Sequence, residues 1–123
     1  AKKPSNFNNL QFTHKHTDEA RCGDIAGDFH PFCYEINEER IEAHSLEGKA
    51  LGFVKIDGNN PCTIFKLQVY QFAKGNGVGK KNLEQAVAWS KSQGCTHVSG
   101  IVFDSKRDYY QKLGAECNPS SYY

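Results

Sequence analysis

A strand-like run, three closely spaced glycines and a helix-like run follow one another in this 123-residue chain. Residues 62–70 are rich in β-branched and aromatic side chains and predict a strand. Residues 80–92 predict a helix that ends before Gly94, because four residues recur at the spacing of one helix face: Leu83, Ala86, Val87 and Ser90. Residues 95–103 predict a further strand. This order implies a right-handed crossover between parallel or nearly parallel strands.

The loop between this strand and helix places its glycines at alternate positions: Gly75, Gly77 and Gly79. Glycines let the backbone approach a ligand closely, and the free amides and dipole of a helix start favour an anion such as phosphate. Lys80 and Lys81 add positive charge there. The loop therefore predicts a phosphate site, although a ligand-free turn between strand and helix would use the same glycines.

Two common nucleotide motifs do not fit this loop. A dinucleotide fingerprint needs its third glycine three positions after the second, whereas Gly79 follows Gly77 by two. A Walker loop needs a glycine where Lys74 stands and a Ser or Thr where Lys81 stands. What remains is the pattern K-x-x-G-x-G, shortly after a strand.

This pattern resembles Q/R-x-x-G-x-G/A, the central motif of the GNAT superfamily of acyl-CoA N-acetyltransferases. The resemblance covers roughly residues 50–117 and rests on segments 51–56, 67–69 and 74–79 and on the Y-x-x-x-G pattern from Tyr110 to Gly114. It implies an α+β (mixed α/β) fold with a GNAT-like central mixed, mostly antiparallel sheet, splayed fourth and fifth strands and flanking helices. Family members commonly use more chain for their first two helices and a last strand hairpin.

The resemblance also implies a site for acetyl-CoA, or coenzyme A, as co-substrate. The loop amides would cradle the pyrophosphate, the backbone of Gln68 and Val69 would pair with the pantetheine arm, and the Val69 amide would stabilise the oxyanion. Lys74 departs from the family's usual Gln or Arg but keeps a charge. The cofactor-binding residues carried over are Gln68, Val69, Lys74, Gly75, Asn76, Gly77, Val78, Gly79 and Lys80.

Tyr110 is the candidate general acid, because it matches the family tyrosine whose hydroxyl lies near the coenzyme A sulfur. A packing role, with the ring in the core, is the alternative for Tyr110. Tyr109 points about 100 degrees away on a helix and is less favoured. The sequence identifies no general base. Three carboxylates are candidates for this role because they lie on or near the predicted early strands: Glu35, Glu42 and Asp57.

The remaining elements are predicted from short patterns. We expect a single domain over residues 1–123, with residues 1–9 loosely held, and at most a short helix within residues 17–31. Four strands, of which the last three form an antiparallel meander, are expected at residues 10–16, 32–36, 40–45 and 50–56. A short helix opened by a capping box at Ser105 would run to Leu113, with Gly114 ending it.

The composition limits the classes of partner and the cellular location that we expect. Fifteen Lys and Arg against fourteen Asp and Glu give a net charge of +1, which does not suggest nucleic acid binding. No apolar run approaches roughly 18 residues, so we expect no membrane association. We expect a cytoplasmic location. We expect the five cysteines to be mostly free, buried thiols. No metal site is expected, since His14 and His16 share a strand face without an evident third ligand.

The sequence thus predicts an acyl-CoA-dependent N-acyltransferase that moves acetyl to a primary amine of a small molecule or a protein by direct attack. A non-catalytic acyl-CoA-binding domain of the same fold is the alternative, and an unrelated α+β interaction module is a third reading. A homodimer is a further expectation, because another subunit could supply the final strand.

Overall fold

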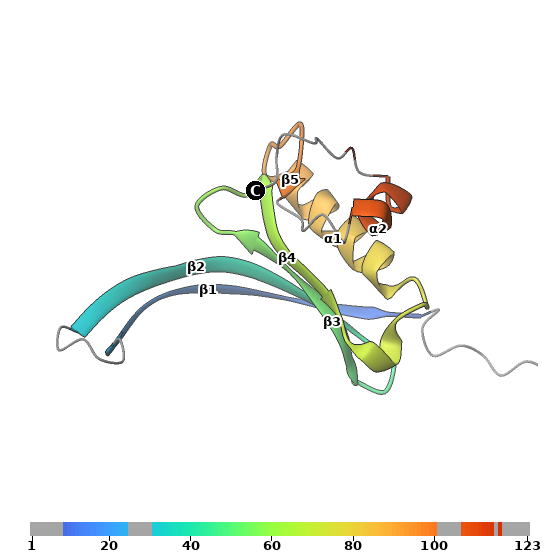
Figure 1. Ribbon diagram of the computed structural model, residues 1–123, viewed down its shortest axis with the longest axis horizontal. Helices are drawn as coiled ribbons and strands as arrows, with labels where there is room; N and C mark the ends of the chain where they lie inside the picture. Colours follow the sequence, from blue (N-terminus) through green and yellow to red (C-terminus); the bar gives the residue numbers. More distant parts are fainter. Residues whose placement is uncertain (1–8, 25–30, 101–106, 115, 117–123) are drawn as a thin grey trace, which may run out of the picture.

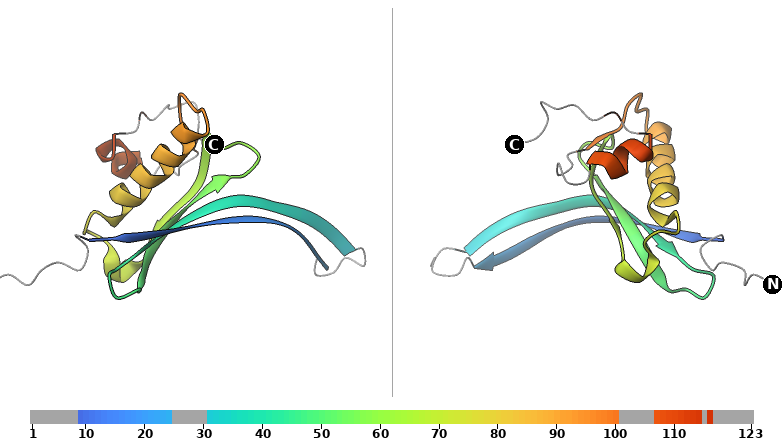
Figure 2. Two further views of the ribbon diagram at one scale, coloured as in Figure 1. Left: turned by 180° about the vertical axis from the view of Figure 1, so that it is seen from behind. Right: turned by 45° about the vertical axis from the view of Figure 1, so that its right-hand side comes forward.

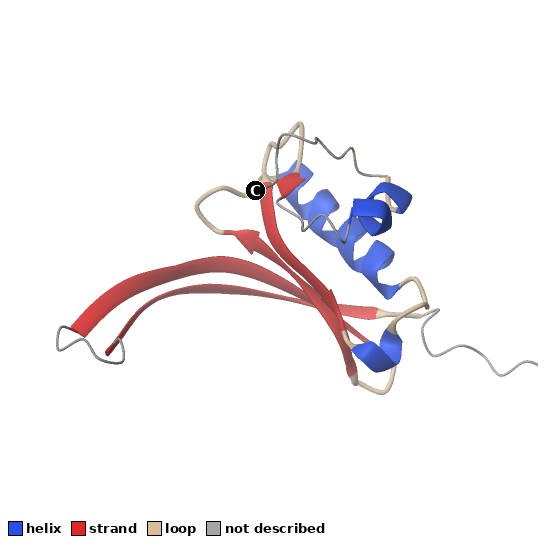
Figure 3. Ribbon diagram, viewed as in Figure 1, coloured by secondary structure: helices blue, strands red, loops and turns tan. Residues whose placement is uncertain are grey.

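The computed structural model describes residues 9–24, 31–100, 107–114 and 116, and a five-stranded sheet organises them (Figures 1 and 3). The strand order is β1-β2-β3-β4-β5; the first four strands are antiparallel, and β5 runs parallel to β4. The elements are β1 Gln11–Asp24, β2 Pro31–His44, β3 Ala50–Asp57, β4 Thr63–Val69, the short 3-10 helix η1 Gln71–Ala73, α1 Val78–Ser92, β5 Ser99–Gly100 and α2 Arg107–Lys112. The predicted mixed, mostly antiparallel α+β fold is confirmed.

Strands β1 and β2 extend far beyond the rest of the sheet as a curved ribbon (Figure 1). They pair over fourteen residues each without a register shift, whereas β3 pairs only with the Glu38–His44 part of β2. The expected helix within residues 17–31 is therefore wrong through Asp24, and residues 25–30 lie outside the described part. The predicted break at residues 37–39 is also wrong, because Asn37 pairs with Asp18 inside one continuous strand.

Four of the five cysteines form disulfides, which corrects the expectation of free thiols. Cys22 and Cys33 face each other across the ribbon with their Cα atoms 4.1 Å apart. Cys62, just before β4, is bonded to Cys95, just after α1. The spacing along the chain gave no hint of either pair, because strand pairing brings Cys22 to Cys33 and the packing of α1 against the sheet brings Cys95 to Cys62. The cysteines therefore no longer argue for a reducing compartment, and Cys117 lies outside the described residues.

Helix α1 covers one face of the sheet through small residues. The buried residues of the helix are Val78, Gly79, Asn82, Ala86 and Ser90. The predicted face is thus only half right, since Leu83 and Val87 are partly exposed and line a groove with Leu113. Small side chains let the helix approach the sheet closely, where Ala86 packs with Ile41, Val54 and Ile56.

The end of α1 agrees with the sequence. The helix stops at Ser92, and Gly94 adopts a left-handed φ of +96°. Trp89 packs against the same apolar cluster. Within the described residues, neither α1 nor α2 is long and apolar enough to span a membrane.

Candidate functional site

The predicted phosphate loop connects β4 to α1 and is fixed by its own side chains. The short helix η1 leads into it, and the Asn76 side-chain amide donates to the carbonyls of Ala73 and Lys74, both at 3.1 Å. Gly75 and Gly77 adopt left-handed φ angles of +83° and +76°, with no atom within 4 Å of where a Cβ would stand. The glycines are therefore needed for the turn itself, and they leave the space in front of it open.

The amides at the start of α1 are available to an anion. The first helical hydrogen bond runs from Lys81 N to Gly77 O at 3.1 Å. In the described part of the chain, the amides of Val78, Gly79 and Lys80 have no backbone acceptor. No acidic residue lies in the first turn, and Lys74 and Lys80 are exposed beside it. The partial positive charge of the helix end is therefore not neutralised locally.

Three elements meet at Gly79. A Cβ at this position would stand 3.2 Å from Cγ2 of Val69, at the end of β4. It would also stand 3.2 Å from Cζ of Tyr109 in α2 and only 1.9 Å from the Tyr109 hydroxyl oxygen. Only glycine allows this approach. The structure thus brings together the end of β4, the N-terminus of α1 and the hydroxyl of Tyr109.

The two adjacent tyrosines of α2 differ in their surroundings. Their rings meet edge to face with centroids 5.3 Å apart. Burial raises the pKa of Tyr109, and burial together with the neighbouring Tyr109 raises the pKa of Tyr110. Both hydroxyls therefore stay protonated at neutral pH, as a proton donor must. Sequence reasoning favoured Tyr110 and set Tyr109 aside, yet it is the Tyr109 hydroxyl that lies against Gly79.

The backbone edge predicted for the pantetheine arm lies at the end of β4. On one side, Gln68 pairs with Phe53 and Val69 with Gly52 of β3. On the other side, the described part of β5 pairs only with Thr63 and Ile64. Residues 101–106, where the predicted splay between the fourth and fifth strands would be visible, lie outside the described part, as does the predicted cap Ser105.

The candidate bases are not gathered at this corner. Glu42 is paired with Arg40 at 2.9 Å and with His44 at 3.1 Å. Glu35 is exposed on the ribbon, and Asp57 ends β3, where its carboxylate accepts from the Asn59 amide. A base therefore remains unidentified.

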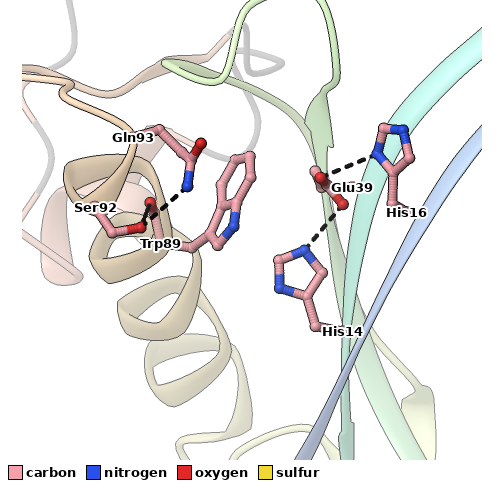
Figure 4. A network of polar contacts seen from close by, with 6 residues as sticks. All are labelled: His14, His16, Glu39, Trp89, Ser92 and Gln93. Atoms are coloured by element: carbon pink, nitrogen blue, oxygen red, sulfur yellow. Dashed lines mark hydrogen bonds and ion pairs between the residues drawn. The ribbon is translucent and has the colours of Figure 1, made fainter.

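Two histidines of β1, His14 and His16, contact the same carboxylate, that of Glu39 in β2 (Figure 4). Nε2 of His14 and Nδ1 of His16 each lie 3.0 Å from an oxygen of Glu39. His14 also meets Trp89 of α1 edge to face, with ring centroids 5.4 Å apart. Among the described residues, no group of His, Cys, Asp or Glu could hold a metal ion. This network links β1, β2 and the C-terminal half of α1.

Comparison with solved structures finds the same fold in acetyltransferases. An acetyltransferase-like protein from Pyrococcus furiosus, described as a putative acetyl transferase, is 21% identical with a TM-score of 0.56 over 68% of this chain and 62% of its own. Glucosamine-6-phosphate N-acetyltransferase from Arabidopsis thaliana is 19% identical with a TM-score of 0.56 over 66% and 61%. Nourseothricin acetyltransferase is 16% identical with a TM-score of 0.55 over 83% and 81%.

At these identities the likeness shows the fold alone, and the chain spans only about three-fifths of the length of the first two of these structures. No curated protein sequence matches the chain. The profile of the Acetyltransferase (GNAT) family, however, matches residues 7–115, which is most of the sequence. The chain therefore belongs to the GNAT acetyltransferase family.

Proposed function

We propose that this protein is an acyl-CoA-dependent N-acyltransferase that transfers acetyl from acetyl-CoA to a primary amine of a small molecule or a protein. The observation that carries the proposal is the corner at Gly79, where open glycine turns and unpaired helix amides lie beside the end of β4 and a tyrosine hydroxyl. Family membership supports it. A related fold, AAC(6')-Iy, has been solved with a bisubstrate analogue that contains CoA.

Each residue of the proposed site is assigned a role in binding acetyl-CoA from its position. The amides of residues 75–80, with Lys74 and Lys80, would hold the diphosphate, because amides and cations converge there. The Asn76 side chain is already used to brace the loop, and Val78 is buried in the core, so both would contribute through their main chain. The backbone of Gln68 and Val69 would pair with the pantetheine arm along the edge of β4 that no described strand covers, and the Val69 amide would bind the oxyanion.

Acetyl-CoA supplies an acyl group activated as a thioester. In the proposed reaction, the amine nitrogen forms a bond to the carbonyl carbon, the carbon–sulfur bond breaks, and the nitrogen loses a proton. Tyr110 would donate a proton to the departing thiolate. Tyr109 would donate a hydrogen bond to the bound cofactor at Gly79, because its hydroxyl lies there.

Two isosteric variants of Gly77 test the site. Asn and Asp both tolerate the left-handed φ of +76° better than most residues and differ only in charge. We expect Gly77→Asp to weaken CoA binding in calorimetry by about tenfold or more relative to Gly77→Asn, since its carboxylate would repel the diphosphate. Equal affinities of the two variants, or no CoA binding by the wild type, would contradict the proposed site.

Phenylalanine variants of the tyrosines separate an enzyme from a binding domain. With an amine panel, Tyr110→Phe should lower kcat with little change in KM for acetyl-CoA, and Tyr109→Phe should raise KM with a smaller effect on kcat. The reverse pattern would move the acid role to Tyr109. CoA binding without amine-dependent CoA release by the wild type would instead favour the non-catalytic alternative.

A further inference from the structure

Among the described residues, no strand pairs with the outer edge of β1, the first strand of the sheet. On the β2 side, the described strands pair with the ribbon only at Glu38–His44, through β3. Two-stranded ribbons are marginal in water, and a long open edge is a template for another strand. Here the Cys22–Cys33 disulfide ties β1 to β2 near the far end of the curved ribbon that Figure 2 shows from two further sides.

The charges along this edge are self-complementary. His14, Lys15 and His16 precede Thr17, and Asp18 and Glu19 follow it. If two copies of β1 pair antiparallel about a two-fold axis at Thr17, Lys15 of each copy faces Glu19 of the other, whose carboxylate also accepts from Arg21 of its own chain. His16 then faces Asp18 in the same way. Both pairings respect the alternation of a strand, because the opposed residues lie on the same face of the joined sheet.

A groove lies beside Phe12, the residue that this register brings opposite Cys22 of the second copy. In the same alignment, Cys22 of one copy stands opposite Phe12 of the other, on the α1 side of the sheet. A surface groove of about 390 Å³ opens at that point between the start of β1 and α1. It is lined by Asn9, Leu10, Phe12, Lys81, Glu84 and Gln85. Charge pattern and groove position are independent observations, and both fit the same register.

We propose that two copies of this chain associate through the outer edges of β1, with Thr17 on the two-fold axis, to form one continuous sheet. The interface is isologous, so each contact occurs twice. In this register the described part of each β1 runs antiparallel to the other β1, with Cys22 of one copy opposite Phe12 of the other. This inference goes beyond the proposed function and does not depend on it, and it uses the opposite sheet edge from the dimer expected from the sequence.

Charge reversal in the full-length protein tests the register by light scattering coupled to size exclusion. The wild type is expected at twice the 13.8 kDa chain mass. Lys15→Glu and Glu19→Lys each place two like-charged pairs across the axis and should raise the dimer Kd about tenfold or more. Lys15 and Glu19 are exposed, so the variants should fold. An equimolar mixture of the two variants should dimerise again, because both pairs become opposite in sign.

Lys91→Glu is the matched control, since it makes the same charge change at an exposed position of α1 and should leave the dimer intact. The proposal is overturned if the wild type stays monomeric across the concentration range. It is equally overturned if Lys15→Glu leaves the Kd unchanged, or if the mixed variants do not associate. A monomeric wild type that binds an extended peptide along β1 would assign the edge to a different occupant and would also overturn it.

Discussion

Replacing Gly79 by alanine probes the corner where α1, β4 and α2 meet. The new Cβ would lie 1.9 Å from the Tyr109 hydroxyl oxygen, and ordinary van der Waals contact begins at 3.4 Å. The hydroxyl would therefore have to retreat by about 1.5 Å, the difference between these two distances. Val69 and the Tyr109 ring, each with an atom 3.2 Å from the Cβ, would have to yield by a few tenths of an ångström.

The magnitude follows from two opposing effects. Overpacking of this kind costs roughly 1–3 kcal/mol. Alanine in a helix gains about 0.5–1 kcal/mol over glycine, and Gly79 is the second residue of α1. We therefore expect Gly79→Ala to lower the free energy of unfolding by about 0–2.5 kcal/mol. In a Tyr109→Ala background the hydroxyl is absent, so the same substitution should be neutral or stabilising by up to about 1 kcal/mol.

Urea unfolding measures this difference as a double-mutant cycle. The chain has one tryptophan, Trp89 on α1, so its fluorescence reports the helix that carries Gly79. The expected coupling between Gly79 and Tyr109 is about 1–3 kcal/mol. Tyr110→Ala is the matched control background, in which Gly79→Ala should behave as it does in the wild type. An identical effect of Gly79→Ala in all three backgrounds would show that Tyr109 does not lie against this helix and would refute the reasoning.

Three further predictions test other parts of the molecule. Gly52→Ala should destabilise by about 2 kcal/mol or more in urea unfolding, because its Cβ would stand 2.5 Å from a backbone oxygen of β4, which cannot swing aside; a near-neutral effect would contradict the register. Replacing both Cys62 and Cys95 by serine should cost about 2–4 kcal/mol, and an unchanged midpoint would show that this bridge constrains nothing. Both tyrosines of α2 are partly buried and have pKa values raised above 10.0, so the stability they contribute is present below that pH and is lost as the pH rises through the raised values. Ultraviolet titration should find two tyrosines that ionise above pH 10.0 and are missing from the curve of the Tyr109→Phe, Tyr110→Phe double variant, and an unchanged titration curve in that variant above pH 10.0 would count against the shifts.

The sequence was most informative where structure is set locally. The glycine loop, the strand before it and the helix after it were predictable, because turn chemistry and apolar periodicity act over a few residues. Gly94 and Gly114 marked helix ends correctly for the same reason, since both adopt left-handed φ angles. The start of α1 at Val78 was missed by two residues.

The ribbon could not be predicted, because it depends on pairing between distant segments. Thr17 to Asp24 contains helix-start and breaker signals, yet its backbone bonds are satisfied by β2. The same pairing brings Cys22 to Cys33. At the candidate site, the spacing of Tyr110 and Gly114 favoured Tyr110, and no local signal indicated that the Tyr109 hydroxyl would reach Gly79. Only the small size of Gly79, in a loop that already had two glycines for its turns, hinted that another group approaches there.

The Cys62–Cys95 bridge makes the segment from the start of β4 to the end of α1 a closed covalent ring. Everything assigned to the cofactor lies within that ring except the two tyrosines. A protease cut in the exposed turn at Gly75 would therefore leave α1 tethered to its strand, and the two fragments would separate only after reduction. The bridge therefore keeps β4 and α1 in one covalent molecule even when the loop between them is cut.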